Sequence, residues 1–177
     1  KTISNVKVPV FETVFGTIKN LNVDNATIVT AKYGGAIAGV LNCTADGGSS
    51  AIINCHATNI NVRGVQIGGV VGRTSQKNCS KDQLKITGCS ATNITLGVIS
   101  TDDFASPDNG NHFVGGIVGG VGATTISGCF AKNITVDATN KISALWGSWD
   151  VSCGGIVGQY YPTSGQSSAN YPVNAGI

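Results

Sequence analysis

The chain has little charge, few helix-forming residues and no long apolar run. Only 11% of its 177 residues are charged and the formal net charge is +2, whereas an average domain has about 25% charged residues. There is no methionine, and Glu12 is the single glutamate. Long helices are therefore not expected. The small net charge, without a dense Lys/Arg cluster, argues against a nucleic-acid partner.

The lack of methionine also bears on the context of the segment. Residue 1 is not a translation start, so we expect this chain to belong to a larger, processed protein. No apolar run approaches the roughly 18 residues that a membrane-spanning helix needs. Any attachment to a membrane is therefore expected only through regions outside this segment.

What the chain does contain is an internal repeat rich in Gly, Ile, Val, Thr and Asn, the residues of strands and tight turns. Four eleven-residue segments align without gaps, and their periods are 34, 34 and 40 residues. They begin at Ile18, Ile52, Ile86 and Ile126. A Gly-rich segment follows each of them, at Gly35–Gly39, Gly68–Gly72, Gly115–Gly119 and Gly154–Gly158.

Within the eleven-residue segment, apolar positions recur at every second residue, which predicts a half-buried strand. The first inward column contains Leu21, Cys55, Cys89 and Cys129. We expect a buried ladder of free thiols at this column, in which a serine at Cys89 would lack a hydrogen-bond partner. An asparagine recurs in every copy, at Asn25, Asn59, Asn93 and Asn133. Because asparagine tolerates left-handed backbone, this column is expected to mark the corner between two strands.

These columns predict an all-β fold, a parallel β-solenoid of about four units of 34–40 residues. Each unit is expected to have three short strands and three corners, and a right-handed course is the default for parallel strands. The chain is predicted to be one segment, with a lead-in (1–16), repeats (17–158) and a partial unit (159–177). An antiparallel sandwich is the alternative, but it would need hairpin signals in place of matching columns.

The repeat also resembles a known family. Gly-Gly-Ile/Val-Val-Gly alternating with Ile-x-Asn/Gly-Cys-x-Ala-x-Asn resembles the GLUG-type repeats of bacterial surface and secreted proteins. The stretch Val14–Leu21 is similar to a lead-in found in such proteins from gut Bacteroidetes. The resemblance covers residues 14–158. It implies an exported, adhesin-like protein at the cell surface or outside the cell, and it supplies no catalytic motif.

Three further cysteines lie outside the ladder. Cys43 and Cys79 occupy the same position after consecutive Gly-rich segments. Because an exported protein permits disulfides, a Cys43–Cys79 bridge is the best pairing available, with two free thiols as the alternative. Cys153 aligns with Ile67 and Val114, at a packing position. No Cys or His spacing resembles a zinc site, and no metal is expected from these residues.

Function is expected in two insertions at one corner of the repeat, Gly97–Phe113 and Asp137–Ser152. Both tryptophans of the chain lie in the second insertion. Exposed tryptophan beside acidic groups is the chemistry of a sugar platform, so a glycan or another cell-surface ligand is the expected partner. The predicted ligand-binding residues are Trp146, Trp149, Asp150, Phe104, Asp102, Asp103 and His112.

Three alternatives to this binding site stay open. The tryptophans could pack against the flank of the fold, which would leave a purely structural stalk. Asp102, Asp103, Asp108 and Asn109 could hold a structural Ca²⁺, the one cofactor that the sequence suggests. A polysaccharide-active enzyme fragment is the third, but the adjacent Asp102 and Asp103 would face opposite sides of a strand. No catalytic residues are predicted.

Overall fold

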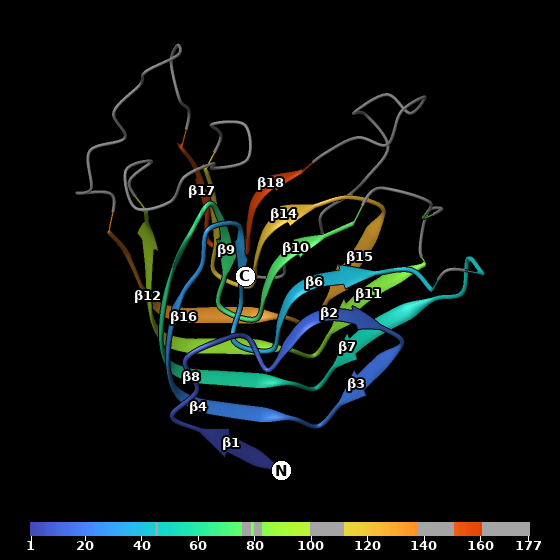
Figure 1. Ribbon diagram of the computed structural model, residues 1–177, viewed down its shortest axis with the longest axis horizontal. Helices are drawn as coiled ribbons and strands as arrows, with labels where there is room; N and C mark the ends of the chain where they lie inside the picture. Colours follow the sequence, from blue (N-terminus) through green and yellow to red (C-terminus); the bar gives the residue numbers. More distant parts are fainter. Residues whose placement is uncertain (45, 76–78, 80–82, 100–111, 138–150, 161–177) are drawn as a thin grey trace.

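The computed structural model describes residues 1–44, 46–75, 79, 83–99, 112–137 and 151–160. These residues form eighteen strands and no helix (Figure 1). A helix able to cross a membrane is accordingly absent from this part of the chain. The strands pair only in parallel, as in β4 with β8 and β8 with β12. The predicted all-β class with parallel sheets is therefore confirmed.

The strands form four sheets, A to D. The strands of each sheet are given below in their spatial order, so that consecutive strands are hydrogen-bonded to each other. Sheet A contains β1 (Thr2–Ser4), β4 (Asn22–Val29), β8 (His56–Gly64), β12 (Ser90–Val98) and β16 (Phe130–Asp137). Sheet B contains β2 (Phe11–Phe15), β6 (Ala38–Asn42), β10 (Val71–Thr74), β14 (Val118–Val121) and β18 (Val157–Tyr160). Sheet C contains β3 (Thr17–Lys19), β7 (Ser50–Ile53), β11 (Leu84–Thr87) and β15 (Thr124–Ser127). Sheet D contains β5 (Tyr33–Gly34), β9 (Gln66–Gly68), β13 (His112–Gly115) and β17 (Val151–Gly154).

From β2 onward the chain visits these sheets in a fixed cyclic order, B, C, A and D. We use the word repeat for one such circuit: β2–β5, β6–β9, β10–β13 and β14–β17. Each strand pairs with its counterpart one repeat later, so the repeats lie one above another (Figure 1). A repeat therefore has four strands. The prediction of three is wrong, because both the eleven-residue and the Gly-rich segments divide into two strands each.

The strand break that the sequence analysis missed is a column of left-handed backbone. Its members lie between sheets C and A: Asn20, Asn54, Gly88 and Gly128, with φ of 55°, 50°, 64° and 59°. The predicted asparagine column is also left-handed, with φ of 54–56° from Asn25 to Asn133. That second column lies within β4, β8, β12 and β16, however, and bends one strand without separating two.

Side chains of the asparagine column bond to one another in its last three copies, whereas Asn59 donates to Asp24 and not to Asn25. Asn133 Nδ2 donates to Asn93 Oδ1 at 2.9 Å, and Asn93 Nδ2 donates to Asn59 Oδ1 at 3.1 Å. Asn25 donates in the same way to Asn5, whose φ is 61°. Because β1 pairs with β4 and β2 with β6, the lead-in expected over residues 1–16 contributes strands to the stack.

A substitution at Asn93 separates backbone strain from side-chain bonding. Asn93→Ala should lower the free energy of unfolding by about 1 kcal/mol more than Asn93→Gly, because only glycine adopts this φ without strain. Urea unfolding followed by circular dichroism measures the difference. Thr92, the preceding residue on the same strand, is the matched control: there the glycine variant should be the less stable one. The same order at both positions would contradict the assignment.

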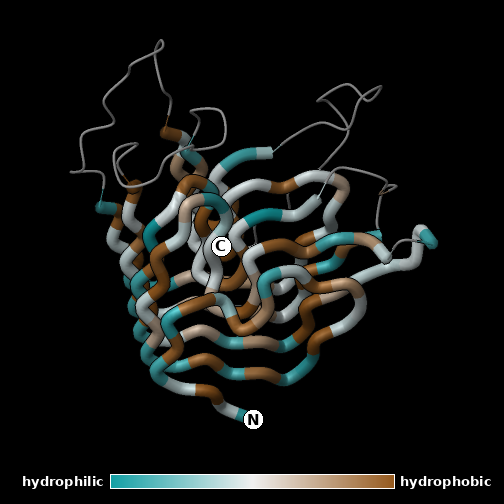
Figure 2. Tube along the Cα trace, in the orientation of Figure 1, coloured by the Kyte–Doolittle hydropathy of each residue, from teal (hydrophilic) through white to brown (hydrophobic). Residues whose placement is uncertain are grey.

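Inward side chains of the four sheets form one apolar core. Figure 2 shows apolar and polar residues alternating along the strands. Successive copies of an inward position stack on one another: Val23 pairs with Ala57, which pairs with Ala91. These three side chains are 1%, 1% and 0% exposed. Stacking of like side chains thus gives a continuous core across the repeats.

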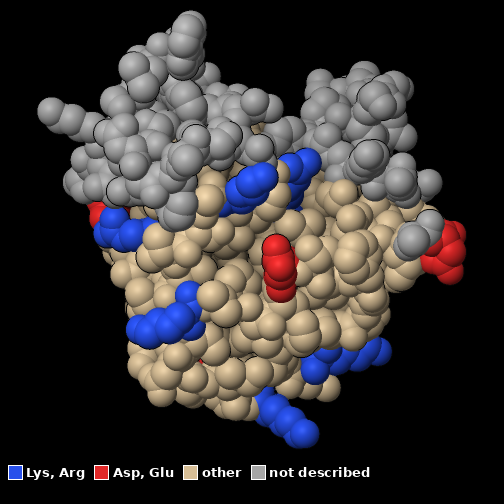
Figure 3. All heavy atoms as spheres, in the orientation of Figure 1, with Lys and Arg blue, Asp and Glu red and all other residues tan. Residues whose placement is uncertain are grey.

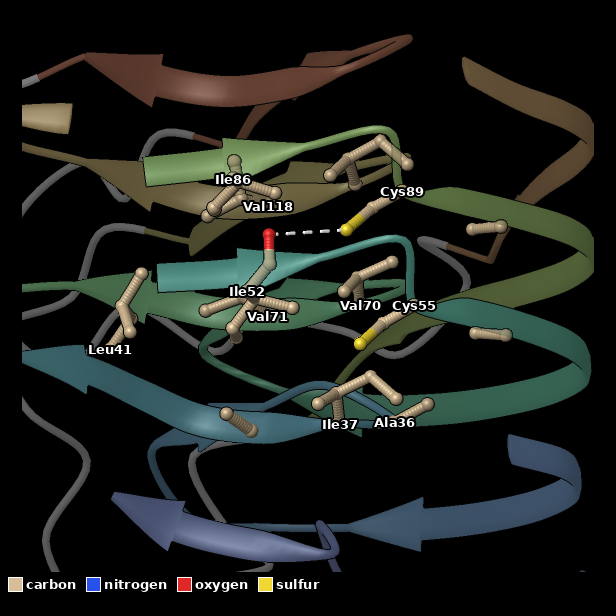
Figure 4. Packing of buried hydrophobic residues seen from close by; sticks show 14 of the residues in the cluster. Ala36, Ile37, Leu41, Ile52, Cys55, Val70, Val71, Ile86, Cys89 and Val118 are labelled. Atoms are coloured by element: carbon tan, nitrogen blue, oxygen red, sulfur yellow. Dashed lines mark hydrogen bonds between the residues drawn. The ribbon is translucent and has the colours of Figure 1, made fainter. Parts of the chain in front are cut away.

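The cysteine ladder lies in this core. Cys55 and Cys89 are 0% exposed and Cys129 is 7% exposed, and all three are free thiols. Cys89 Sγ donates to the carbonyl oxygen of Ile52 at 3.4 Å (Figure 4). The carbonyl oxygen of Thr87 also lies at 3.4 Å. Two carbonyl oxygens thus lie near the side chain at this position, and the expected cost of a serine there stays a prediction. Hydrogen bonding with Cys129 and Cys55, together with burial, raises the pKa of Cys89 well above its ordinary value.

Cys153 differs from the ladder cysteines. It pairs in register with the buried Val114, but its own side chain is exposed. The predicted packing position is thus not buried at this strand, because sheet D ends at β17 among the described residues. Partial burial still raises the pKa of the Cys153 thiol.

Thiol labelling tests this arrangement. At mildly alkaline pH, iodoacetamide should modify Cys153 in the native protein and should reach the three ladder cysteines only after unfolding. Mass spectrometry of labelled peptides counts the modified sites. The Cys153→Ser variant is the control and should show no fast labelling. Fast labelling of Cys89 in the native state would contradict a buried ladder.

Candidate functional site

The connection from sheet A to sheet D is where the repeats differ most. In the first repeat, residues 30–32 join β4 to β5, and in the second Val65 alone joins β8 to β9. In the third and fourth repeats, residues 99–111 and 138–150 make this connection, 13 residues in each case. The two insertions predicted from the sequence are thus equal in length and occur at the same corner.

Both insertions also leave and re-enter the stack at neighbouring points. At their start, Gly97 of β12 pairs with Asp137 of β16. At their end, His112 of β13 pairs with Val151 of β17. Strands paired in a sheet lie about 4.8 Å apart. The sheets therefore fix the bases of the two insertions one repeat spacing apart.

The base of the first insertion is packed into the protein. Val98 and Ile99 are 0% and 3% exposed where the chain leaves, and His112 and Phe113 are 1% and 3% exposed where it returns. His112 was predicted as a ligand-binding residue. Its side chain is buried at the start of β13, and its role in ligand binding stays a prediction.

An ion pair fixes the base of the second insertion. Arg63 of β8 donates to Asp137 Oδ2 at 2.7 Å, although Asp137 lies two strands away on β16. The arginine crosses Gly97 of β12, where an added Cβ would lie 2.9 Å from Arg63 Cγ. Glycine at position 97 thus leaves the space in which the arginine lies. The ion pair joins the second repeat to the last residue before the second insertion.

A double-mutant cycle with Arg63→Met and Asp137→Asn measures this ion pair. Because both side chains are partly exposed, at 33% and 24%, we expect a coupling free energy of about 0.5–1 kcal/mol that falls at high salt. A cycle of Arg63→Met with Asp46→Asn is the control and should show no coupling. Coupling that is zero, or that does not change with salt, would contradict the role of the pair.

Most of the predicted ligand-binding residues lie outside the described residues: Phe104, Asp102, Asp103, Trp146, Trp149 and Asp150. The suggested Ca²⁺ ligands Asp108 and Asn109 do as well. Across the ranges that the structure does describe, no group of three or more His, Cys, Asp or Glu side chains could hold a metal ion. The sugar platform and the calcium site therefore stay predictions.

The predicted disulfide lies at another corner, between sheets B and C. Cys43 and Cys79 are bonded, with their Cα atoms 5.8 Å apart. Cys43 directly follows β6 of the second repeat, and Cys79 follows β10 of the third. The bond therefore links two consecutive repeats at a corner away from the insertions.

The structure also contains a groove that the sequence analysis did not anticipate. It has a volume of about 570 Å³ and lies where β2, β5 and β6 approach one another. Its polar lining consists of Glu12, Thr13, Thr30, Lys32 and Tyr33. The signal for it in the sequence is Glu12, which stands where the later repeats have glycine.

Comparison of the chain with protein-family models, with curated proteins and with solved structures finds no match. The resemblance to GLUG-type repeats stays a prediction.

Proposed function

We propose that the chain is a parallel, right-handed β-solenoid of the GLUG-like kind. Two observations support this. The strands visit four sheets in one cyclic order, and each sheet keeps one register from repeat to repeat. The right hand follows from the general preference of connections between parallel strands.

We further propose that this solenoid is an exported, surface-associated module that presents a ligand-binding surface. The observation that carries the proposal is the pair of 13-residue insertions whose ends lie on paired strands. Long connections in compact proteins are uncommon unless they are functional or disordered. Two insertions of equal length on adjacent repeats favour one binding surface to which both insertions contribute. The Cys43–Cys79 disulfide is in keeping with an oxidising, extracellular location.

A glycan is the ligand that the composition of the insertions favours. Trp146 and Trp149 supply aromatic faces for a sugar ring, and Asp102, Asp103 and Asp150 supply acceptors for its hydroxyl groups. Stacking of one ring on one indole contributes on the order of 1 kcal/mol beyond area burial. The affinity of one module would thus be weak, and adhesion would depend on multivalent display.

A stalk that only separates other domains is the second candidate. The stack favours it, because strands of the second and third repeats pair on both sides and the disulfide fastens these two repeats together. A stalk needs no ligand, so the two candidates differ in the outcome of a binding experiment.

A glycan array probed with the chain held on a multivalent carrier distinguishes them. A presenting module should give a signal that Trp149→Ala or Trp146→Ala reduces by at least about tenfold, which corresponds to 1.4 kcal/mol. Phe15, an exposed aromatic on β2 with 59% exposure, provides the matched control, and Phe15→Ala should bind normally. Circular dichroism verifies that each variant is folded. Absence of signal, or equal signal from all variants, would favour the stalk.

A further inference from the structure

The groove beside β5 arises from one irregularity in the order of the strands. After β1 in sheet A the chain passes directly to β2 in sheet B, so the strand of sheet D is missing. From Asn5 to Phe11 the chain advances six positions, whereas from Asn25 to Ala38, the counterpart of Phe11, it advances thirteen. β5 is consequently the first strand of sheet D. The groove lies in the place of the missing strand.

The column of sheet B that contains Glu12 also reflects the missing neighbours at this end of the stack. Glycine occupies it in the later repeats, at Gly39, Gly72, Gly119 and Gly158. At the last three, a Cβ would clash with the sheet D strand two repeats earlier, and at Gly39 it would clash with the backbone of Glu12. At Gly72, for example, it would lie 2.5 Å from the backbone nitrogen of Gly34. In β2, the end strand of sheet B, the same column holds Glu12, because neither a sheet B strand nor a sheet D strand precedes it among the described residues. Glu12 thus lines the groove where the other repeats tolerate no side chain.

Tyr33 of β5, in the first repeat, is the aromatic group of the groove, and Arg73 of β10, in the third repeat, fixes its position. The guanidinium of Arg73 lies over the Tyr33 ring, 5.0 Å from its centroid. Arg73 Nη1 also donates to the Tyr33 hydroxyl at 2.7 Å. Contacts of a cation with both the ring and its hydroxyl hold the ring in one orientation. A ligand would therefore meet an aromatic group that needs little reordering on binding.

The remaining polar groups combine hydrogen-bond acceptors and donors of both charges. Glu12 supplies a carboxylate, Lys32 an ammonium group, and Thr13 and Thr30 hydroxyl groups. An anionic ligand would meet the carboxylate and a cationic one would meet the ammonium group. A neutral ligand with many hydroxyl groups can use both, donating to Glu12 and accepting from Lys32. Charged side chains of both signs occur on the face shown in Figure 3.

We propose that this groove is a carbohydrate-binding site for a neutral sugar, with Tyr33 as the aromatic contact and Glu12 and Lys32 as its polar contacts. The volume of about 570 Å³ lies within the range of roughly 300–1,000 Å³ that is usual for small-ligand sites. The site is distinct from the two insertions, which follow β12 and β16 in later repeats. It therefore stands whether or not the insertions bind a ligand.

The test is a titration of the isotope-labelled chain with neutral sugars, followed by backbone amide chemical shifts. The probes are the methyl glycosides of glucose, galactose, mannose and N-acetylglucosamine, each up to tens of millimolar. At least one should shift amide signals within residues 8–13 and 30–40. Glu12→Gln keeps the size of the side chain and should weaken that binding by at least about tenfold, which corresponds to 1.4 kcal/mol. Tyr33→Ala should abolish it.

Two control variants show whether the binding belongs to this groove. Phe15→Ala removes an exposed aromatic from the same strand as Glu12 and should leave binding unchanged. Phe130→Ala, at an exposed aromatic on β16 of the fourth repeat, should also leave it unchanged. The proposal is overturned if none of the four sugars shifts these amides, or if Glu12→Gln binds as tightly as the original chain. It is also overturned if an extended peptide binds at β5 and the sugars do not, because the groove would then accept a strand.

Discussion

Parallel pairing of each strand with its own counterpart one repeat later is the constraint on which the rest of the structure depends. Because the register is constant, equivalent side chains lie about 4.8 Å apart in columns. A charged column would bring like charges together, which is destabilising. Columns of Ile, Val, Ala, Thr, Asn and Cys avoid this cost, and the low charge of the chain, 11% of its residues, is a direct consequence. The Asn59–Asn93–Asn133 column shows that a side chain able to both donate and accept can bond to copies of itself.

The same constraint explains where the chain can vary. Positions that face a neighbouring repeat are restricted, as Gly72 and Gly119 show through the backbone atoms that a Cβ would meet. Connections between strands are not restricted in this way. Two of the four connections from sheet A to sheet D are therefore able to contain 13 residues each. Glu12 lies between these cases. It occupies a restricted column on β2, the end strand of sheet B, where no earlier strand lies against it.

Much of the fold could be predicted from the aligned columns, because a constant register requires similar residues at equivalent positions of each repeat. The inward positions of Cys55 and Cys89, the left-handed backbone at Asn25 and the pairing of Cys43 with Cys79 all follow from alignment of the copies. The number of strands did not follow, because each Gly-rich segment divides into two strands, as in β9 and β10, which its composition does not reveal. The corner at Asn20, Asn54, Gly88 and Gly128 was also missed, because that column mixes two residue types. The groove escaped prediction for another reason: it depends on a missing strand, and alignment of copies reveals what is present. Its contact between Arg73 and Tyr33 joins different sheets and different repeats, which the spacing of residues along the chain does not encode.

The Cys43–Cys79 bond has a consequence for the mechanics of the chain. Its partners are 36 positions apart in the sequence, and a fully extended chain spans at most about 3.3–3.6 Å per residue. When the protein is pulled from its two ends, the bond removes roughly 120 Å of contour length from the extension that the polypeptide can reach. That length is released only by reduction of the bond. Under load, the chain would therefore lengthen from the segments outside this loop, and the maximal reach of the module would depend on the redox conditions around it.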